Sequence, residues 1–487
     1  MKTTNCLHFI LMWLLACIDA STLGTSGLKR TSETMNSDNL STLVLTEVTH
    51  DFHSATTEET SLYHECTAEA IDCDTQSTLE VKHDNEVNTS SWKCVLSNTH
   101  NETTTKKVLY NTHKVYTLWP KTDEQIQALL QLEKNYTKEL DFWTLVRLDG
   151  PVEIMATPKT FPILENFTKH HNLTATVRIN DVQILIDAQL PPANSTIHSF
   201  NWDYFYDLDK IYTWMDSLEA NYSDVLTPLL IGCSYEGRPI RGVKLSKKRN
   251  NPGVFIEAGT HAREWIATTT ALWIIYALLT SDDEDIKKVS EDFDWYIFPT
   301  VNPDGYHYSY VTDRFWRKTR SSGDPCSLIY PGPKPFSEVE TLRLSEYVRE
   351  IRDNVQVYLD FHSYSQILMF PYSYTTNHTD DYDIYMFIAN KSAAALKLVN
   401  GTDYVVGDIA NIADGSSVDW MYGVLKIPLC FAYELRDKGQ KGMLLPPNEI
   451  IPTAKETLVS IQAILEYGGD IIRNDYKKWN SWEESSA

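Results

Sequence analysis

The stretch from Gly253 to Trp265 reads Gly-Val-Phe-Ile-Glu-Ala-Gly-Thr-His-Ala-Arg-Glu-Trp. Its first residues are mainly apolar, as in a buried strand, and polar side chains follow at His261, Arg263 and Glu264. The run from Ala271 to Leu279 is apolar throughout and predicts a buried core helix. A strand that passes through a polar turn into a helix indicates an α/β domain, in which sites form at the carboxyl ends of strands.

Strand and helix patterns alternate from about residue 199 to residue 474, which predicts one large α/β domain. The expected strands are 253–257, 294–298, 355–359 and 429–433, and the expected helices are 207–220, 265–279, 337–352, 382–398 and 451–467.

Residues 107–190 have a separate pattern, which Pro191-Pro192 ends as a linker. Thr122 is a suitable N-cap for the first helix of this segment. The expected strands are 114–118, 152–155 and 174–179, and the expected helices are 123–136 and 161–170. The order β-α-β-α-β predicts a small α+β sandwich.

The first twenty residues combine Lys2 with an apolar run from Phe9 to Ala16, which predicts a secretory signal peptide over residues 1–20. A membrane anchor is the alternative, but the run is shorter than the roughly 18 apolar residues that span a bilayer. Residues 21–106 are acidic and rich in Ser and Thr, so we expect a poorly ordered extension there. Residues 475–487 form a C-terminal tail.

The chain has 43 Lys and Arg against 66 Asp and Glu, for a formal net charge of -23. It lacks the basic excess that attracts nucleic acid or anionic membranes, so neither is an expected partner. The sequence predicts a secreted, extracellular and monomeric glycoprotein in which some of the eight cysteines form disulfide bonds. Eleven Asn-x-Ser/Thr sites support secretion: Asn39, Asn88, Asn101, Asn135, Asn166, Asn172, Asn194, Asn221, Asn377, Asn390 and Asn400.

Three side chains near the ends of predicted strands could bind a metal. His261 and Glu264 are three residues apart, which brings both to one side of a tight turn, although such a pair alone is more typical of a solvated helix start. His362 ends another apolar run, where a histidine is by itself more often a satisfied core residue. Together they form a set of two imidazoles and one carboxylate with an open fourth position, which suits a catalytic zinc ion.

Two further residues suit acid–base and electrostatic roles. Glu434 follows a predicted strand and could take a proton from a zinc-bound water, unless it is a surface carboxylate paired with Arg436. Arg317 lies in a basic run that would ordinarily be solvated. Trp316 inside this run indicates that Arg317 points inward, where it could stabilise an oxyanion.

Six segments, in this order, resemble the secreted zinc metallocarboxypeptidases of the pancreatic and insect digestive kind. They are 231–240 (Ile-Gly-Cys-Ser-Tyr-Glu-Gly-Arg-Pro-Ile), 261–265 (His-Ala-Arg-Glu-Trp), 301–306 (Val-Asn-Pro-Asp-Gly-Tyr), 317–320 (Arg-Lys-Thr-Arg), 362–366 (His-Ser-Tyr-Ser-Gln) and 434–437 (Glu-Leu-Arg-Asp). The resemblance runs from about Lys107 to Tyr467. It implies a mixed, twisted sheet flanked by helices over residues 199–474, and an activation propeptide over residues 107–190 that covers the cleft as an intramolecular inhibitor.

The resemblance also implies roles for single residues. Glu434 would be the general base, and Arg317 would polarise the scissile carbonyl and stabilise the oxyanion. The expected ligands of one Zn2+ per chain are His261, Glu264 and His362. The expected substrate-binding residues are Arg263, Tyr364 and Val418. An apolar residue at Val418 implies a preference for apolar C-terminal residues.

The chain departs from the family pattern at three places. Roughly 25 residues are missing near 320–326. In the family this stretch holds an Asn-Arg pair that grips the substrate carboxylate, an Asp that orients the first zinc-binding His, and a Cys that pairs at the position of Cys326. No tyrosine aligns at Asn411, where the family has a mobile residue that caps the substrate. No Lys or Arg lies between Ile179 and Asp209, so a trypsin-like protease could not cut the linker.

These features leave competing hypotheses. The first is a secreted procarboxypeptidase that removes C-terminal, apolar residues from peptides or proteins by zinc-activated water. The second is a catalytically impaired relative, a zinc- or peptide-binding glycoprotein that has lost its carboxylate anchor. A third is that the sequence lacks one exon of the true transcript.

Overall fold

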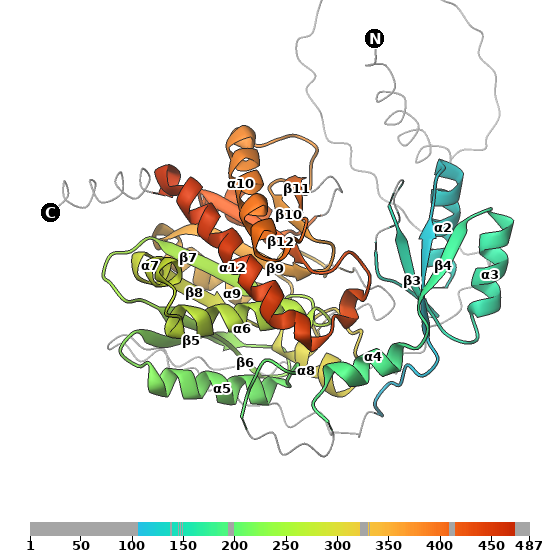
Figure 1. Cartoon of the computed structure of the whole chain (residues 1–487), viewed down its shortest axis with the longest axis horizontal. Helices are drawn as coiled ribbons and strands as arrows, with labels where there is room; N and C mark the ends of the chain where they lie inside the picture. The colour runs from blue at the N-terminus through green and yellow to red at the C-terminus, as the bar shows by residue number, and fades with distance from the viewer. Residues whose placement is uncertain are drawn as a thin grey trace, which may run out of the picture. The chain divides into compact units, whose positions relative to one another are not determined.

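The computed structural model describes residues 106–136, 139–144, 146, 148, 150–192, 199–321, 330, 332–408 and 414–472 (Figure 1). All of them belong to one compact unit, Val87–Ala487. The predicted signal peptide, the extension up to residue 105, Cys326, Asn411 and the C-terminal tail lie outside the described residues. Within the described ranges, we find no helix whose length and hydropathy suit it to crossing a membrane.

The described part of the large domain is built on an eight-stranded mixed sheet of order β11-β10-β12-β9-β7-β8-β6-β5. The strands are β5 (Leu226–Cys233), β6 (Pro239–Leu245), β7 (Gly253–Ala258), β8 (Asp294–Phe298), β9 (Val355–Ser363), β10 (Ile367–Phe370), β11 (Val405–Asp408) and β12 (Leu429–Leu435). Strands β8, β7, β9 and β12 are parallel neighbours, whereas β5 and β6 pair with antiparallel strands. The predicted α/β class with a mixed sheet is confirmed.

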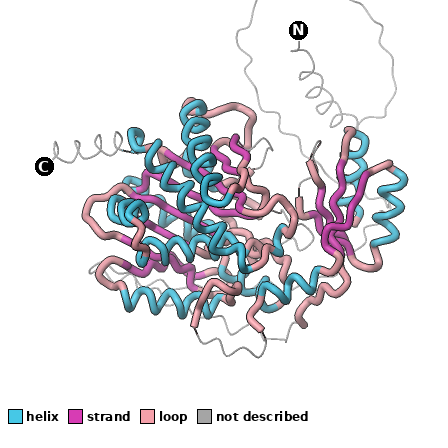
Figure 2. The backbone as a smooth tube through the Cα atoms, viewed as in Figure 1, coloured by secondary structure: helices cyan, strands magenta, loops and turns pink. Residues whose placement is uncertain are grey.

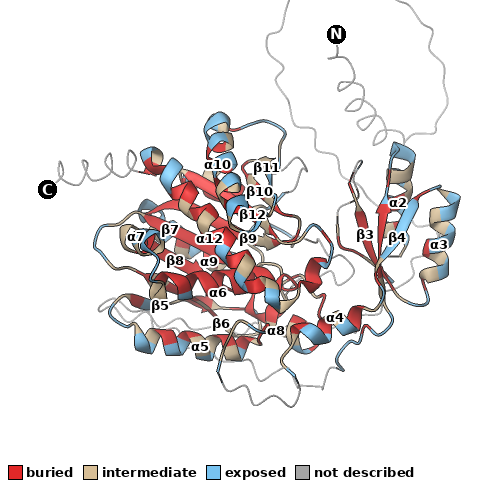
Figure 3. Cartoon of the chain, viewed as in Figure 1, coloured by how far each residue is buried: buried red, intermediate tan, exposed pale blue. Residues whose placement is uncertain are grey.

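Helices pack on both faces of this sheet (Figure 2). They are α5 (Leu208–Asn221), α6 (Trp265–Thr280), α7 (Glu284–Asp292), α8 (Pro303–Val311), α9 (Val339–Ile351), α10 (Tyr382–Asn400), α11 (Ser417–Gly423) and α12 (Ile450–Tyr467). The larger core joins the sheet to α5, α6, α10 and α12, and the smaller core joins it to α9 and α11. Helix α6 is buried along nearly its whole length, as its apolar sequence predicts (Figure 3).

The smaller domain has a four-stranded antiparallel sheet of order β2-β3-β1-β4. Its elements are β1 (Lys114–Trp119), α2 (Asp123–Asn135), β2 (Leu140–Phe142), β3 (Val152–Ala156), α3 (Phe161–His170), β4 (Thr174–Ile179) and α4 (Val182–Gln189). Thr122 caps α2 as predicted, because its side chain accepts a hydrogen bond from the Gln125 amide. The predicted order lacked β2 and α4.

The two faces of this small sheet have different partners because side chains alternate along a strand. On β3, Ile154 packs in a cluster with α2 and α3 of the same domain. The next residue, Met155, packs in a cluster that includes Phe315 and Tyr364 of the large domain. The sheet is therefore covered by its own helices on one side and by the large domain on the other.

Candidate metal centre

Three parallel strands bring two predicted metal ligands and the predicted general base to one edge of the large sheet. His261 follows β7, and His362 is the penultimate residue of β9, the neighbour of β7. Glu434 lies on β12 and is paired in register with His362. Gly259 directs the chain out of β7 with a φ of +71°, and a Cβ there would press on Thr268 and Thr300. The carboxyl ends of β7, β9 and β12 therefore meet at one site.

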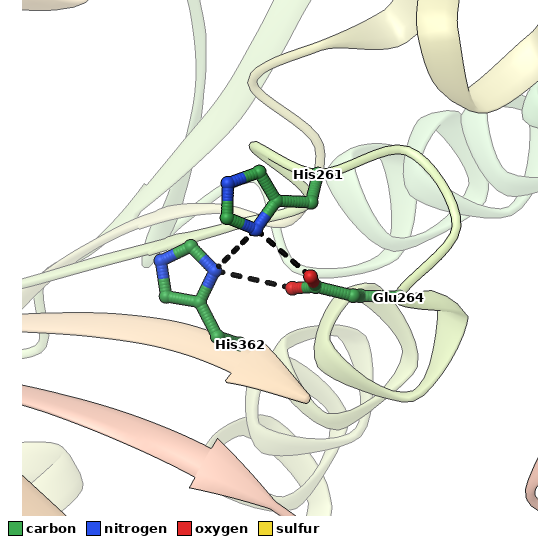
Figure 4. A group of neighbouring side chains, drawn as sticks. All are labelled: His261, Glu264 and His362. Atoms are coloured by element: carbon green, nitrogen blue, oxygen red, sulfur yellow. Dashed lines mark hydrogen bonds and ion pairs between the residues drawn. The ribbon is translucent and has the colours of Figure 1, made fainter. Parts of the chain in front are cut away.

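Three side chains converge at this edge (Figure 4). His261 Nδ1 lies 2.8 Å from Glu264 Oε1 and 3.0 Å from His362 Nδ1, and His362 Nδ1 lies 3.1 Å from Glu264 Oε2. Donor atoms of a tetrahedral zinc ion lie about 3.3 Å apart, given bond lengths of about 2.0–2.1 Å. Two imidazole nitrogens that face one another beside a carboxylate therefore fit a zinc ion.

The surroundings of Glu264 and Glu434 rule out the alternative explanations for these two residues. Glu264 is 5% exposed, and both of its carboxylate oxygens face the two histidines, so the pair with His261 is no solvated helix start. Glu434 is not paired with Arg436, because that guanidinium hydrogen-bonds Glu449 and Glu456 instead.

The electrostatic environment favours a neutral His261 beside an ionised Glu264. Burial and the positive charge of Arg317 lower the pKa of His261 to about 4. Burial alone would raise the pKa of Glu264, but His261 and His362 outweigh it and hold that pKa well below its usual range. An ionised carboxylate and a neutral imidazole are the forms that bind zinc.

Glu434 and Arg317 lie within electrostatic reach of this cluster. Burial and the charge of Glu264 raise the pKa of Glu434 to about 8. Burial lowers the pKa of Arg317, and the carboxylates of Glu264 and Glu434 oppose this effect. The backbone carbonyl of Arg317 accepts a hydrogen bond of 2.9 Å from the Ala262 amide, which ties the basic segment to the His261 turn.

The three predicted substrate-binding residues have different surroundings. Arg263 is 4% exposed, and its guanidinium lies 3.4 Å from Asp141 of the small domain. Tyr364 donates a hydrogen bond to Glu153, also of the small domain. Val418, on α11, is buried in the smaller core of the large domain. The small domain thus touches two of the three.

Sequence reasoning missed a buried polar group behind His362. Asp360 Oδ2 lies 2.9 Å from His362 Nε2 and accepts a hydrogen bond of 2.7 Å from Ser417. Glu257 is paired in register with Asp360, and burial together with that neighbour raises the pKa of Glu257 to about 8. The two-residue period of a strand could have indicated this contact, because Asp360 and His362 are two residues apart and therefore share a face.

Sequence reasoning also missed a residue that joins the loops of the site. Asn302 Nδ2 donates hydrogen bonds of 3.1 Å to the carbonyls of Thr260 and Lys318, next to His261 and Arg317 respectively. Its Oδ1 accepts a hydrogen bond from Gly305 and caps α8. Asn302 belongs to the 301–306 segment that resembles the family, but nothing in the sequence alone indicated what it would contact.

Two family sequence patterns match the chain. The pattern described as zinc carboxypeptidase matches residues 211–324 and 321–460, and the pattern described as carboxypeptidase activation peptide matches residues 116–189. The chain belongs to the zinc carboxypeptidase family. The family's zinc requirement agrees with the cluster of His261, Glu264 and His362. The zinc carboxypeptidase match consists of two pieces, which overlap at residues 321–324.

Relatives of this zinc carboxypeptidase come from insects and mammals. It is 43% identical over 291 residues to a zinc carboxypeptidase of Simulium vittatum, covering 54% of this chain and 96% of that protein. It is 35% identical over 393 residues to carboxypeptidase A2 of Rattus norvegicus, covering 73% and 94%. The solved structure of thrombin activatable fibrinolysis inhibitor has a TM-score of 0.68 at 28% identity and covers 75% of this chain and 100% of that chain.

Proposed function

We propose that this chain is the zymogen of a secreted metallocarboxypeptidase that hydrolyses the last peptide bond of peptides or proteins. The observation that carries the proposal is the convergence of His261, Glu264 and His362 at the carboxyl ends of adjacent strands, with Glu434 paired beside His362. The catalytically impaired alternative is not favoured, because the similar proteins of Simulium vittatum and Rattus norvegicus are named as carboxypeptidases.

Each residue of the site would have a separate role in the hydrolysis. A zinc ion bound by His261, Glu264 and His362 would supply a Lewis acid and lower the pKa of a bound water. Glu434 would accept the proton of the attacking water and later donate it to the leaving amine. Glu434 would ionise more readily beside a dication, because an opposite charge lowers the pKa of a carboxyl group. Arg317 would stabilise the negative charge that develops on the carbonyl oxygen.

The small domain would inhibit the enzyme by occupying its substrate-binding residues. Asp141 on β2 forms an ion pair with Arg263, and Glu153 on β3 accepts a hydrogen bond from Tyr364. We propose that Arg263 and Tyr364 bind the substrate upstream of the scissile bond, so a peptide and the small domain would compete for them. Activation would then need cleavage in the linker between Leu190 and Phe200 by a protease that does not require Lys or Arg.

The substrate class and the compartment are also proposals. Val418 is apolar and buried, which supports a preference for apolar C-terminal residues. Cys233 is disulfide-bonded, as in proteins of oxidising compartments. Seven asparagines of Asn-x-Ser/Thr sites are among the described residues, and all are exposed, as glycosylation requires: Asn135, Asn166, Asn172, Asn221, Asn377, Asn390 and Asn400.

The test compares the uncleaved chain with a chain that carries a specific protease site between Pro192 and Phe200. We expect zinc-dependent release of the last residue from a blocked dipeptide ending in Phe, faster than from one ending in Arg, and only after cleavage. Glu434→Gln should lower kcat about 10²–10⁴-fold and retain zinc. Glu466→Gln, an exposed residue of α12, is the matched control and should retain activity. Zinc binding without turnover of either substrate would support the impaired alternative instead.

A further inference from the structure

Asp360 and His362 form a buried pair on β9. They are two residues apart on the strand, so both side chains point to the same face. Asp360 Oδ2 lies 2.9 Å from Nε2 of His362. The other ring nitrogen, Nδ1, faces His261 and Glu264 (Figure 4). Asp360 therefore contacts the side of the imidazole ring that is opposite to the metal cluster.

This contact selects a tautomer of the ring. A carboxylate oxygen is a hydrogen-bond acceptor, and Oδ2 of Asp360 lies 2.9 Å from Nε2 of His362, so the contact favours the ring form that carries a hydrogen on Nε2. A neutral imidazole with its hydrogen on Nε2 has its lone pair on Nδ1. That lone pair points to the place where His261 and Glu264 converge, as a zinc ligand requires.

Asp360 is itself held in place. It is 4% exposed, its backbone lies in the centre of the sheet between β7 and β12, and its Oδ2 also accepts a hydrogen bond of 2.7 Å from Ser417. Its other oxygen, Oδ1, is buried and has no hydrogen-bond partner among the described residues. A buried carboxylate with an unpaired oxygen costs stability, so stability alone does not account for an aspartate at this position.

His261 has no comparable support. Its hydrogen bonds within the described ranges all use Nδ1, and none of the described residues bonds its Nε2. We propose that Asp360 is a positioning residue that holds Nδ1 of His362 towards the metal, and that zinc affinity depends on it. This inference rests on the proposed function, since it takes the cluster to be the zinc site.

The test measures zinc affinity of the full uncleaved chain by competition with a chromophoric chelator. Asp360→Ala should raise the zinc dissociation constant about 10–100-fold, the usual effect of removing the carboxylate behind a metal-binding histidine. Asp360→Asn keeps an oxygen that can accept from Nε2, so part of the affinity should return. Ser417→Ala removes the support of Asp360 without touching His362, and its loss should be smaller than that of Asp360→Ala. The absorption spectrum of cobalt(II) bound to Asp360→Ala should differ from that of cobalt(II) bound to the wild type, because a reoriented His362 changes the ligand field of the metal.

Glu340→Gln is the control, because Glu340 is another buried carboxylate, which accepts a hydrogen bond from the Tyr235 amide and from no metal ligand. Its zinc affinity should equal that of the wild type. If the wild type binds no zinc, both the proposed function and this inference fail. If the wild type binds one zinc ion and Asp360→Ala binds it equally well, or loses no more affinity than Glu340→Gln, only the inference fails. If Asp360→Ala does not fold, Asp360→Asn and Ser417→Ala still test the inference. Zinc affinity equal to that of the wild type in both of these variants would contradict it.

Discussion

Tyr364 of the large domain donates a hydrogen bond of 2.5 Å to Oε2 of Glu153 in the small domain. Glu153 is 1% exposed and Tyr364 is 6% exposed. The other oxygen of Glu153 has no hydrogen-bond partner among the described residues, although Arg178 lies 3.7 Å away. Burial and the charge of Asp437 raise the pKa of Glu153 to about 7, and Tyr364 and Arg178 only partly offset this. Burial of Glu153 at the contact between the domains therefore favours the protonated form of its carboxyl group.

The first prediction concerns pH. Glu153 in the folded chain keeps its proton at pH values where the unfolded chain, with a carboxyl pKa near 4.5, has lost it. The folded state then binds more protons, so its stability falls as pH rises from about 4.5 to about 7, by at most about 3 kcal/mol, and is constant above. Glu153→Gln mimics the protonated form and should melt like the wild type at pH 4.5 but at higher temperature than the wild type at pH 8.

The control for this prediction is Glu165→Gln, which changes an exposed glutamate of α3 in the same domain. Its melting temperature should follow that of the wild type at every pH. Identical pH dependence of the wild type and Glu153→Gln would show that Glu153 does not titrate in this range.

The second prediction concerns Gly439, whose φ is +88° and where a Cβ would collide with Oε1 of Glu153. Gly439→Ala should weaken docking of the small domain and raise the residual activity of the uncleaved chain. Gly401→Ala is a matched control, because Gly401 has a φ of +76° and open space around its Cβ. Both variants should lose about 1 kcal/mol of stability from backbone strain, but only Gly439→Ala should gain residual activity. Equal activity of the two variants would contradict the predicted collision.

The third prediction concerns Asp141. Its side chain is 18% exposed and Arg263 is nearly buried, so Asp141→Asn leaves Arg263 without its anionic partner. Losing a hydrogen bond to a charged group costs about 1.5–3 kcal/mol, so residual activity of the uncleaved chain should rise about tenfold or more. Asp123→Asn, an exposed residue at the start of α2, should leave that activity at its wild-type level. The activity is measured before any cleavage of the linker, and an unchanged value for Asp141→Asn would remove Asp141 from the inhibitory contact.

The fourth prediction concerns removal of zinc. Three donor side chains converge at His261, Glu264 and His362, so a bound ion stabilises the folded state by mass action. Zinc at 100 times its dissociation constant should raise the melting temperature by about 5–10 °C relative to the chelated protein. Magnesium should not replace it, because that ion prefers oxygen ligands. A melting temperature that does not respond to zinc would contradict a zinc site in the folded chain.

The main elements of the fold could be predicted because their sequence patterns are long. The apolar run that begins at Trp265 predicted a helix to Leu279, and α6 ends at Thr280. Strands of three or four residues, such as β2, β10 and β11, are too short for a period of two to appear. Strand β5 was missed for another reason, since several of its residues are exposed or half-buried and it lies at the edge of the sheet.

The sequence by itself determined the chemical types at the metal centre: two imidazoles and two carboxylates that follow strand patterns, at His261, Glu264, His362 and Glu434. Only the tertiary structure decided which other carboxylate side chains contact residues of the predicted site. Asp141 lies 122 residues before Arg263, and Glu153 lies 211 residues before Tyr364. Asp360 acquires its role from the pairing of β9 with β7 and β12. Such contacts depend on sheet register and domain packing, which a local pattern of residues does not encode.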